Sequence, residues 1–296
     1  MIRVGIIVQA IALGIAVVLA GTLPRNLLFV ANLHVYPAVP WAVPVVAVYL
    51  WFFWRYLGGA GPPDSTAVQR RESLRANAVS GSVWVWSLVA GTLGMVALVF
   101  ALRLANRVVM LPRQPVPNLS QLSQVTTVAL LLASAPIAGV VEEAAFRGYM
   151  QRPIEKRCGL AVAILITGTM FALAHLDFTP VLWPYYVTVA AIYGTVAYLT
   201  DSILPAIVLH TGGNLYSNFD LWLNGRAEWQ AATSPSELIW STGPDASFWT
   251  TTAGFLLAGA MALWAYMRLA RSAGRRRSAV RGSLIDGRPP PAAPLA

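Results

Sequence analysis

The stretch that decides the fold runs from 125 to 149 and reads VTTVALLLASAPIAGVVEEAAFRGY. No charged side chain interrupts it before Glu142, and as a helix it is long enough to cross a hydrocarbon core of about 30 Å. Glu142, Glu143 and Arg147 then follow within the same run. Ionisable groups are costly inside a membrane helix and usually face a cavity or a partner. This stretch therefore predicts a membrane helix and a functional site near its end.

The composition of the whole chain is that of a membrane protein. Of its 296 residues, 57% are hydrophobic and 11% are charged, whereas a soluble domain carries about 25% charged residues. This composition excludes a soluble enzyme, a disordered protein and a coiled coil. It also excludes a disulfide scaffold, since Cys158 is the one cysteine. We expect an all-α, polytopic membrane helix bundle of about eight transmembrane helices. The apolar segments lie at 6–23, 41–56, 83–102, 125–149, 160–176, 181–199, 202–215 and 251–267.

The positive charges predict the orientation of the chain. With the N-terminus inside, 16 of the 21 Lys and Arg residues fall in inner segments, so the positive-inside rule places both termini in the cytosol. The net charge of +9 resides in short loops and in the tail. It therefore indicates membrane topology and contact of the tail with anionic lipids, and no nucleic acid partner. The preference for Arg over Lys suggests a bacterial plasma membrane.

The same patterns predict the domain organisation. We expect a single transmembrane domain over 1–267, with a catalytic core at about 125–215. Residues 268–296 are basic and Pro-rich, which predicts a disordered cytosolic tail. For the first helix, a cleaved signal peptide is the alternative, because Arg3 precedes an apolar stretch and small residues follow it.

Three polar clusters lie within the apolar segments. In the first, Glu143 and Arg147 are four residues apart and share a helix face, so we expect a structural ion pair. Glu142 points about 100° away from Glu143 and is the carboxylate left for chemistry.

The other two clusters supply imidazoles and an amide. Phe171 and His175 lie at the end of one apolar segment. His210 and Asn214 share a face of another, and the two glycines between them would let a helix or a substrate backbone approach closely.

Together these groups predict hydrolysis of a peptide or ester bond without a covalent intermediate. A carboxylate with an imidazole can activate water, and His and Asn donors can stabilise an oxyanion. The nucleophile motif G-x-S-x-G is absent. A zinc site with Glu142, His175 and His210 as ligands is an open alternative, although no H-E-x-x-H pair supports it. A transporter is a weaker reading, because the sequence contains no internal repeat.

The patterns Glu-Glu-x-x-x-Arg at 142–147, Phe-x-x-x-His at 171–175 and His-x-x-x-Asn at 210–214 resemble the CPBP family. These proteins are intramembrane glutamic endopeptidases, and they include CAAX prenyl proteases and bacteriocin-processing or immunity proteins. The resemblance implies an eight-helix membrane bundle whose cavity is reached from the membrane and the cytosol.

The resemblance also implies a role for each motif residue. Glu142 would be the general base that activates water, and His175 would assist it and orient the water. His210 and Asn214 would form the oxyanion hole. The supporting residues would be Glu143, Arg147 and Phe171.

The predicted function is therefore an intramembrane, metal-independent endopeptidase that requires no cofactor. Its partner would be a peptide or protein substrate, lipidated or not, and its activity CAAX-like or peptide-processing. Two alternatives stay open: a non-proteolytic immunity or partner-binding membrane protein, and a zinc-dependent membrane protease.

Overall fold

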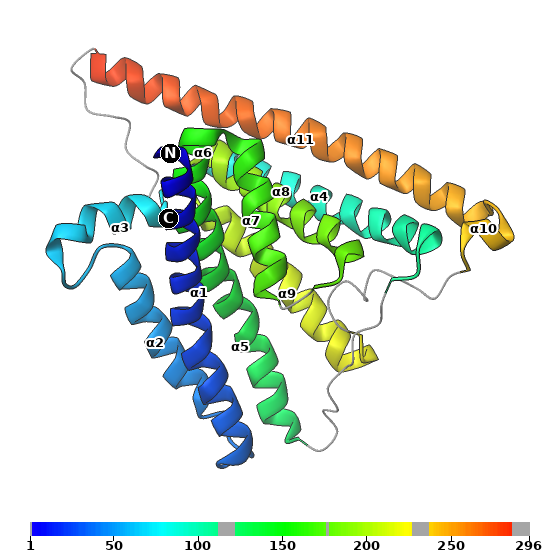
Figure 1. The fold of residues 1–296 in the computed structure, drawn as a ribbon, viewed down its shortest axis with the longest axis horizontal. Coiled ribbons are helices and arrows are strands. Elements are labelled where there is room, and N and C mark those ends of the chain that lie inside the picture. Colours follow the sequence, from blue (N-terminus) through cyan, green and yellow to red (C-terminus); the bar gives the residue numbers. More distant parts are fainter. Residues whose placement is uncertain (1, 112–121, 176–177, 227–236, 286–296) are drawn as a thin grey trace.

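The computed structural model describes residues 2–111, 122–175, 178–226 and 237–285 (Figure 1). These residues form helices and connecting turns, and no strand occurs among them, so the predicted all-α fold is confirmed. The α-helices are α1 (Ile2–His34), α2 (Ala42–Leu57), α3 (Ala67–Leu74), α4 (Gly81–Val108), α5 (Gln124–Glu142), α6 (Arg152–Cys158), α7 (Leu160–Ala174), α8 (Trp183–Thr200), α9 (Leu204–Asn224), α10 (Ile239–Thr242) and α11 (Ala246–Ile285). The 3₁₀-helices are η1 (Asp64–Thr66) and η3 (Pro180–Leu182), and the π-helix is η2 (Glu143–Gln151).

Each of the eight predicted apolar segments coincides largely with a helix. Within the described ranges, four helical stretches are long and apolar enough to cross a membrane, and the chain is an integral membrane protein. They are Val4–His34, Gly81–Val108, Gln124–Cys158 and Ala246–Gly274. Two shorter apolar helices are Ala42–Leu57 and Leu160–Ala174. The number of eight membrane crossings stays a prediction.

Helix α1 extends beyond its predicted end at residue 23, although Pro24 lies inside it. A proline has no backbone N–H, so the carbonyl four residues earlier loses its helical donor. The hydroxyl of Tyr49 in α2 donates to that carbonyl, Ala20 O, at 2.5 Å. This contact replaces the lost hydrogen bond and ties α2 to α1.

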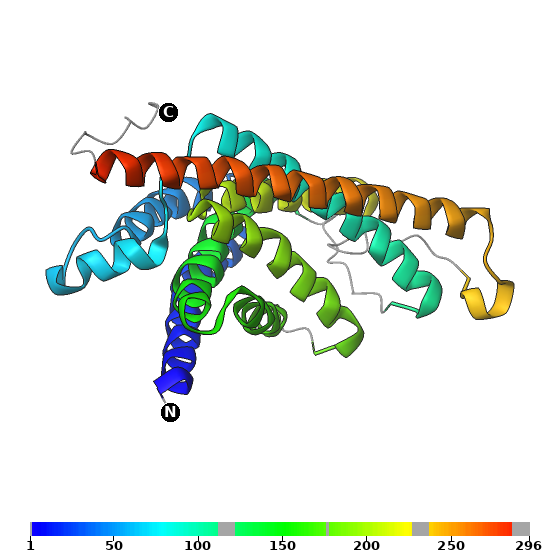
Figure 2. The same ribbon diagram turned by 90° about the horizontal axis from the view of Figure 1, so that it is seen from above.

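Helix α11 also continues past the expected domain boundary at residue 267, as far as Ile285. Alanine and arginine are strong helix formers, and the first proline of the tail is Pro289. The helix lies across α4 and α8 (Figures 1 and 2). Residues 286–296 lie outside the described ranges, so the division into a membrane domain and a disordered tail stays a prediction.

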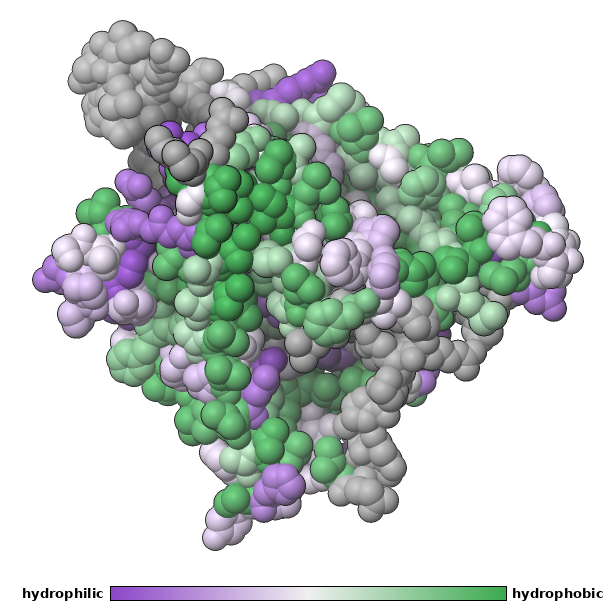
Figure 3. Space-filling view, viewed as in Figure 1, coloured by the Kyte–Doolittle hydropathy of each residue, from purple (hydrophilic) through white to green (hydrophobic). Residues whose placement is uncertain are grey.

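Large apolar side chains point outward from the helices. Leu27, Phe52 and Leu263 are 71%, 60% and 63% exposed. In Figure 3 apolar residues cover much of the face shown, while polar ones gather around α3 at its edge. An outer surface of this kind is suited to lipid rather than to water.

Ion pairs join several helix ends at one end of the bundle. Arg75, which follows α3, lies 2.6 Å from Glu155 of α6 and 2.9 Å from Asp201 in the turn between α8 and α9. Arg152 lies 3.3 Å from the same Asp201. We call this end, with α3, α6 and the α8–α9 turn, the basic end. Helices α1, α7 and α9 end at the opposite end.

Candidate active site

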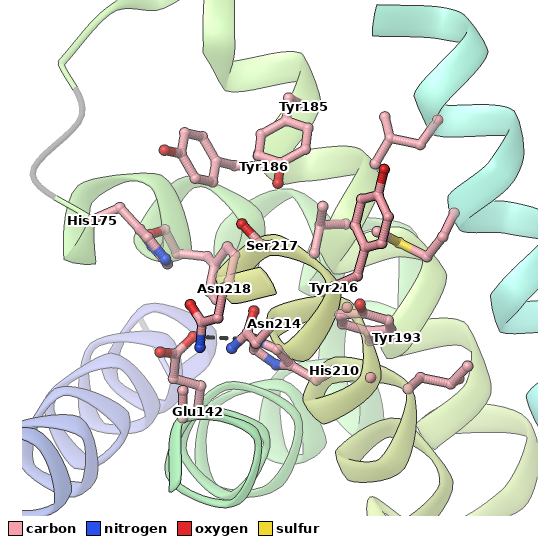
Figure 4. Close-up of a pocket in the computed structure, with 18 of the residues that line it drawn as sticks. Glu142, His175, Tyr185, Tyr186, Tyr193, His210, Asn214, Tyr216, Ser217 and Asn218 are labelled. Atoms are coloured by element: carbon pink, nitrogen blue, oxygen red, sulfur yellow. Dashed lines mark hydrogen bonds and ion pairs between the residues drawn. The ribbon is translucent and has the colours of Figure 1, made fainter. Parts of the chain in front are cut away.

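The polar clusters of the sequence meet in a cavity of about 910 Å³. Helices α1, α4, α5, α7, α8 and α9 form its walls. All four predicted catalytic residues line it, and Figure 4 shows them around a common space. They are Glu142, His175, His210 and Asn214. The structure therefore brings together side chains that are 72 positions apart in the sequence at most.

The cavity lies in the half of the bundle away from the basic end. Its lining from α1 begins at Val18, halfway along that helix, and reaches Asn26. From α7 it takes the last turn with His175, and from α9 it takes residues as far as Asn218. Asn26 and Arg103 are exposed at this end. Exposed residues of the lining therefore lie toward the end of the bundle opposite the Arg75 ion pairs, and Val208, near the start of α9, is also exposed.

His210 lies between the two adjacent carboxylates. Its Nδ1 is 2.8 Å from Glu143 Oε1, and its Nε2 is 3.7 Å from Glu142 Oε2. The side chain of Glu143 is completely buried, whereas that of Glu142 is 16% exposed and lines the cavity. Because a carboxylate oxygen accepts, Nδ1 donates to Glu143, and Nε2 is the nitrogen turned toward Glu142. Glu143 thus sets the orientation of the imidazole, and Glu142 is the carboxylate that a substrate can reach.

The expected pair of Glu143 and Arg147 is present. Arg147 Nη1 lies 3.0 Å from Glu143 Oε1, and both side chains are completely buried. The Arg147 guanidinium also lies over the rings of Phe171 at 5.1 Å and Tyr193 at 5.4 Å. A guanidinium over an aromatic face is stabilised electrostatically. Arg147 is therefore held on several sides beneath the cavity.

His175 is fixed by the helix turn that carries it. Its Nδ1 lies 2.8 Å from the carbonyl oxygen of Phe171, and its ring packs 4.5 Å from the Phe171 ring. A carbonyl only accepts, so Nδ1 carries the proton, and Nε2 is left as an acceptor. This tautomer is the one that a water-activating role requires. Phe171 also lies 6.2 Å from the His210 ring, so it contacts both histidines and the arginine.

The two glycines before Asn214 border open space. A Cβ added at Gly212 would meet nothing within 4 Å, and one at Gly213 would meet only the Tyr193 hydroxyl at 3.4 Å. Of the two expected uses of these glycines, room for a substrate is thereby favoured over helix packing. The close helix contact is at Gly139 of α5 instead, where a Cβ would clash with Thr211 Oγ1 and lie 3.1 Å from Ile207 O.

The helix that carries the first cluster changes type at the site. The backbone is α-helical to Glu142 and π-helical from Glu143 to Gln151. A π-helix is rare and is often found at functional sites. All nine residues of η2 are buried, and among them Phe146 lines the cavity. The change occurs between Glu142, which lines the cavity, and Glu143, which is buried with Arg147.

The zinc alternative needs three ligands that converge on one point. Among the described residues, no three His, Cys, Asp or Glu side chains lie close enough to hold a metal ion. Glu142, His175 and His210 are all described, so their present arrangement does not fit a zinc site.

Sequence reasoning missed the contribution of α1 and α4. The first helices carry no motif, yet Thr22, Arg25 and Asn26 of α1 and Thr92 and Arg103 of α4 line the cavity. Arg25 lies just beyond the apolar segment predicted at 6–23, whereas the structure places it within α1. An arginine directly after an apolar segment can indicate a functional cation at the end of a membrane helix. This signal applies to Arg25 because α1 continues through Pro24.

Residues 124–216 match the family described as type II CAAX prenyl endopeptidase Rce1-like. The predicted resemblance to CAAX-type membrane endopeptidases is thereby confirmed over these residues, which contain all three motifs. No curated protein and no solved structure matches the chain. The matched region covers α5 to α9 and leaves out the walls that α1 and α4 provide.

Proposed function

We propose that the chain is a glutamic intramembrane peptidase, because its residues 124–216 match a family of CAAX-type membrane endopeptidases. Glu142 is the general base, and the carboxylate removes a proton from the attacking water. The observation that carries the proposal is the shared cavity of Glu142, His175, His210 and Asn214. An intramembrane cavity with a carboxylate, two imidazoles and an amide has the donors and acceptors that peptide hydrolysis requires.

The histidines and the amide have separate tasks in this mechanism. The unprotonated Nε2 of His175 accepts from the water and orients it toward the scissile carbonyl. The oxygen of that carbonyl becomes an oxyanion, which the Asn214 amide and a protonated Nε2 of His210 stabilise. The bond to Glu143 keeps the His210 ring turned for this contact. Water supplies both the hydroxyl of the new acid and, through Glu142, the proton of the new amine.

The first experiment compares wild type with Glu142→Gln. The amide has almost the same shape but cannot accept a proton as a carboxylate does. We expect cleavage of an S-farnesylated, quenched-fluorescence CAAX peptide to fall by about 10²- to 10⁴-fold, the usual effect of losing a general base. The matched control is Glu72→Gln, the same chemical change on exposed α3, and it should keep wild-type activity. Full activity in Glu142→Gln would contradict the mechanism and favour a binding module.

Substrate identity can be sought in the same pair of proteins. We expect the membrane fraction of cells that express wild type to contain a protein with a new N- or C-terminus that Glu142→Gln cells lack. Addition of a strong chelator should leave the peptide cleavage unchanged. Loss of activity on chelation, with stoichiometric zinc in the purified protein, would favour the metalloprotease instead.

We also propose that both termini lie in the cytosol of a bacterial cell and that the basic tail contacts anionic lipid. The orientation follows from the charges of the basic end. Since the exposed lining residues Asn26 and Arg103 lie toward the opposite end, the substrate then enters from the extracytoplasmic half of the membrane. This differs from the cytosolic access that the family resemblance implies.

Cysteine labelling in intact cells tests the orientation. In a Cys158→Ser background, Asn26→Cys places a thiol at the exposed rim of the cavity, and Lys156→Cys places one on exposed α6. A membrane-impermeant maleimide should label Asn26→Cys in intact cells and Lys156→Cys only after permeabilisation. The reverse pattern would place the termini outside and the cavity in the cytosol.

A further inference from the structure

One cation in the cavity is not accounted for by the proposed mechanism. Arg25 lies on α1, outside the region that matches the endopeptidase family, and its side chain lines the cavity. Its Nε atom is buried and has no hydrogen-bond partner among the described residues. Arg147 differs in having an ion pair, with Glu143 at 3.0 Å, and the described residues form no ion pair with Arg25.

A guanidinium in this position is costly unless something binds to it. Burial of a charged donor without a partner is unfavourable, and in a membrane protein an isolated cation marks a functional site by default. Glu142 attracts Arg25 electrostatically, but this carboxylate is required for the water. Besides Arg103 of α4, the cavity lining therefore contains in Arg25 a cation close to Glu142 whose planar donors suit an anion that arrives from outside.

The place of Arg25 along α1 shows which part of a substrate could reach it. Gly21 packs against the side chain of Val141, the residue before Glu142. Arg25 follows Gly21 by one helical turn, about 6 Å closer to the end of the bundle opposite the basic end. An extended peptide advances about 3.3 Å per residue. An anion held by Arg25 therefore lies about two extended residues from a bond next to Glu142.

We infer that Arg25 binds the C-terminal carboxylate of the substrate and so fixes the distance from the chain end to the cleaved bond. Arg25 is then a specificity-determining residue. The inference rests on the proposed function in one respect, that the substrate is a peptide.

The test measures binding rather than cleavage, so that it does not depend on the mechanism. A fluorescent, S-farnesylated CAAX peptide is prepared with a free C-terminal carboxylate and, separately, with a C-terminal amide. Both are titrated against Glu142→Gln protein in phosphatidylcholine vesicles, in which no cleavage is expected. We expect the free acid to bind about 10- to 100-fold more tightly than the amide, as for a charge-assisted pair in a partly buried site.

The matched variants separate recognition from general charge effects. In the Glu142→Gln background, Arg25→Gln should weaken binding of the free acid to the level of the amide and leave amide binding unchanged. Arg25→Lys should keep part of the preference. Arg226→Gln removes a cation that pairs with Asp220 outside the cavity and should keep the full preference.

Three results would overturn the inference. They are equal binding of acid and amide, binding of neither peptide, and an equal loss of both in Arg25→Gln. The first is also the result expected if Arg25 holds a lipid phosphate. The two hypotheses can be separated. If binding of the acid is preferred and the preference depends on Arg25, the proposed role of Arg25 is supported, and full cleavage by Glu142→Gln protein would still refute the proposed mechanism.

Discussion

Replacement of Glu143 by glutamine should damage the fold more than the same replacement of Glu142. The Glu143 side chain is completely buried and lies 3.0 Å from Arg147 and 2.8 Å from His210. Arginine remains charged after Glu143→Gln, so the variant leaves a fully buried guanidinium without its anion. Loss of one partner from a buried ion pair costs about 3–5 kcal/mol.

For Glu142→Gln the expected cost is much smaller. Its carboxylate is partly exposed to the cavity, and the nearest histidine nitrogen is 3.7 Å away, beyond hydrogen-bond distance. We expect a change within about 1 kcal/mol, as for most substitutions that break no buried pair. The two glutamates are neighbours in sequence, so a difference between them reports on their surroundings rather than on depth in the membrane.

The assay is thermal unfolding of the purified protein in detergent. Glu143→Gln should lower the midpoint by roughly 6–20 °C and Glu142→Gln by at most about 4 °C. The double variant Glu143→Gln/Arg147→Met removes both charges and should recover much of the loss, because no unpaired ion is left inside. Equal midpoints for the two single variants, or no recovery in the double variant, would refute the reasoning.

Three further substitutions test the site. Gly139→Ala should destabilise the protein by about 1–3 kcal/mol and lower peptide cleavage, because its Cβ would press against Thr211 and separate α5 from α9. Wild-type unfolding and kinetics in this variant would contradict the packing described. Gly212→Ala should leave the unfolding midpoint unchanged, because its Cβ meets nothing within 4 Å. The same variant should raise the KM for the peptide, and an unchanged KM would show that the substrate does not approach this glycine. Cleavage by His175→Ala should fall by about 10²-fold or more, and wild-type cleavage would remove His175 from the mechanism.

Several parts of the site could be predicted because one helix carries both partners. The spacing of Glu143 and Arg147 predicted their ion pair, and the spacing of His210 and Asn214 predicted that both would face one space. Helical periodicity fixes such relations within a single element. The long apolar segments were found for the same kind of reason, since length and composition alone identify them.

Relations between elements could not be predicted in this way. The bond between Glu143 and His210 joins residues 67 positions apart, and the sequence suggested only that Glu143 pairs locally. The π-helix depends on the packing of nine buried residues, which periodicity does not report. The predicted apolar segment ends at residue 23, and the continuation of α1 through Pro24 to Arg25 depends on a contact with another helix, the bond from the Tyr49 hydroxyl to Ala20 O.

The proposed catalytic residues and part of the cavity wall come from different parts of the chain. All four proposed catalytic residues lie within 124–216, the region similar to the CAAX-type endopeptidases. The facing walls come from α1 and α4, which that similarity does not cover. A family can keep its hydrolytic groups while these walls vary, because a cavity wall selects a ligand by shape and charge without taking part in bond cleavage. The identity of the substrate therefore cannot be transferred from the family, and it has to be sought in residues such as Arg25.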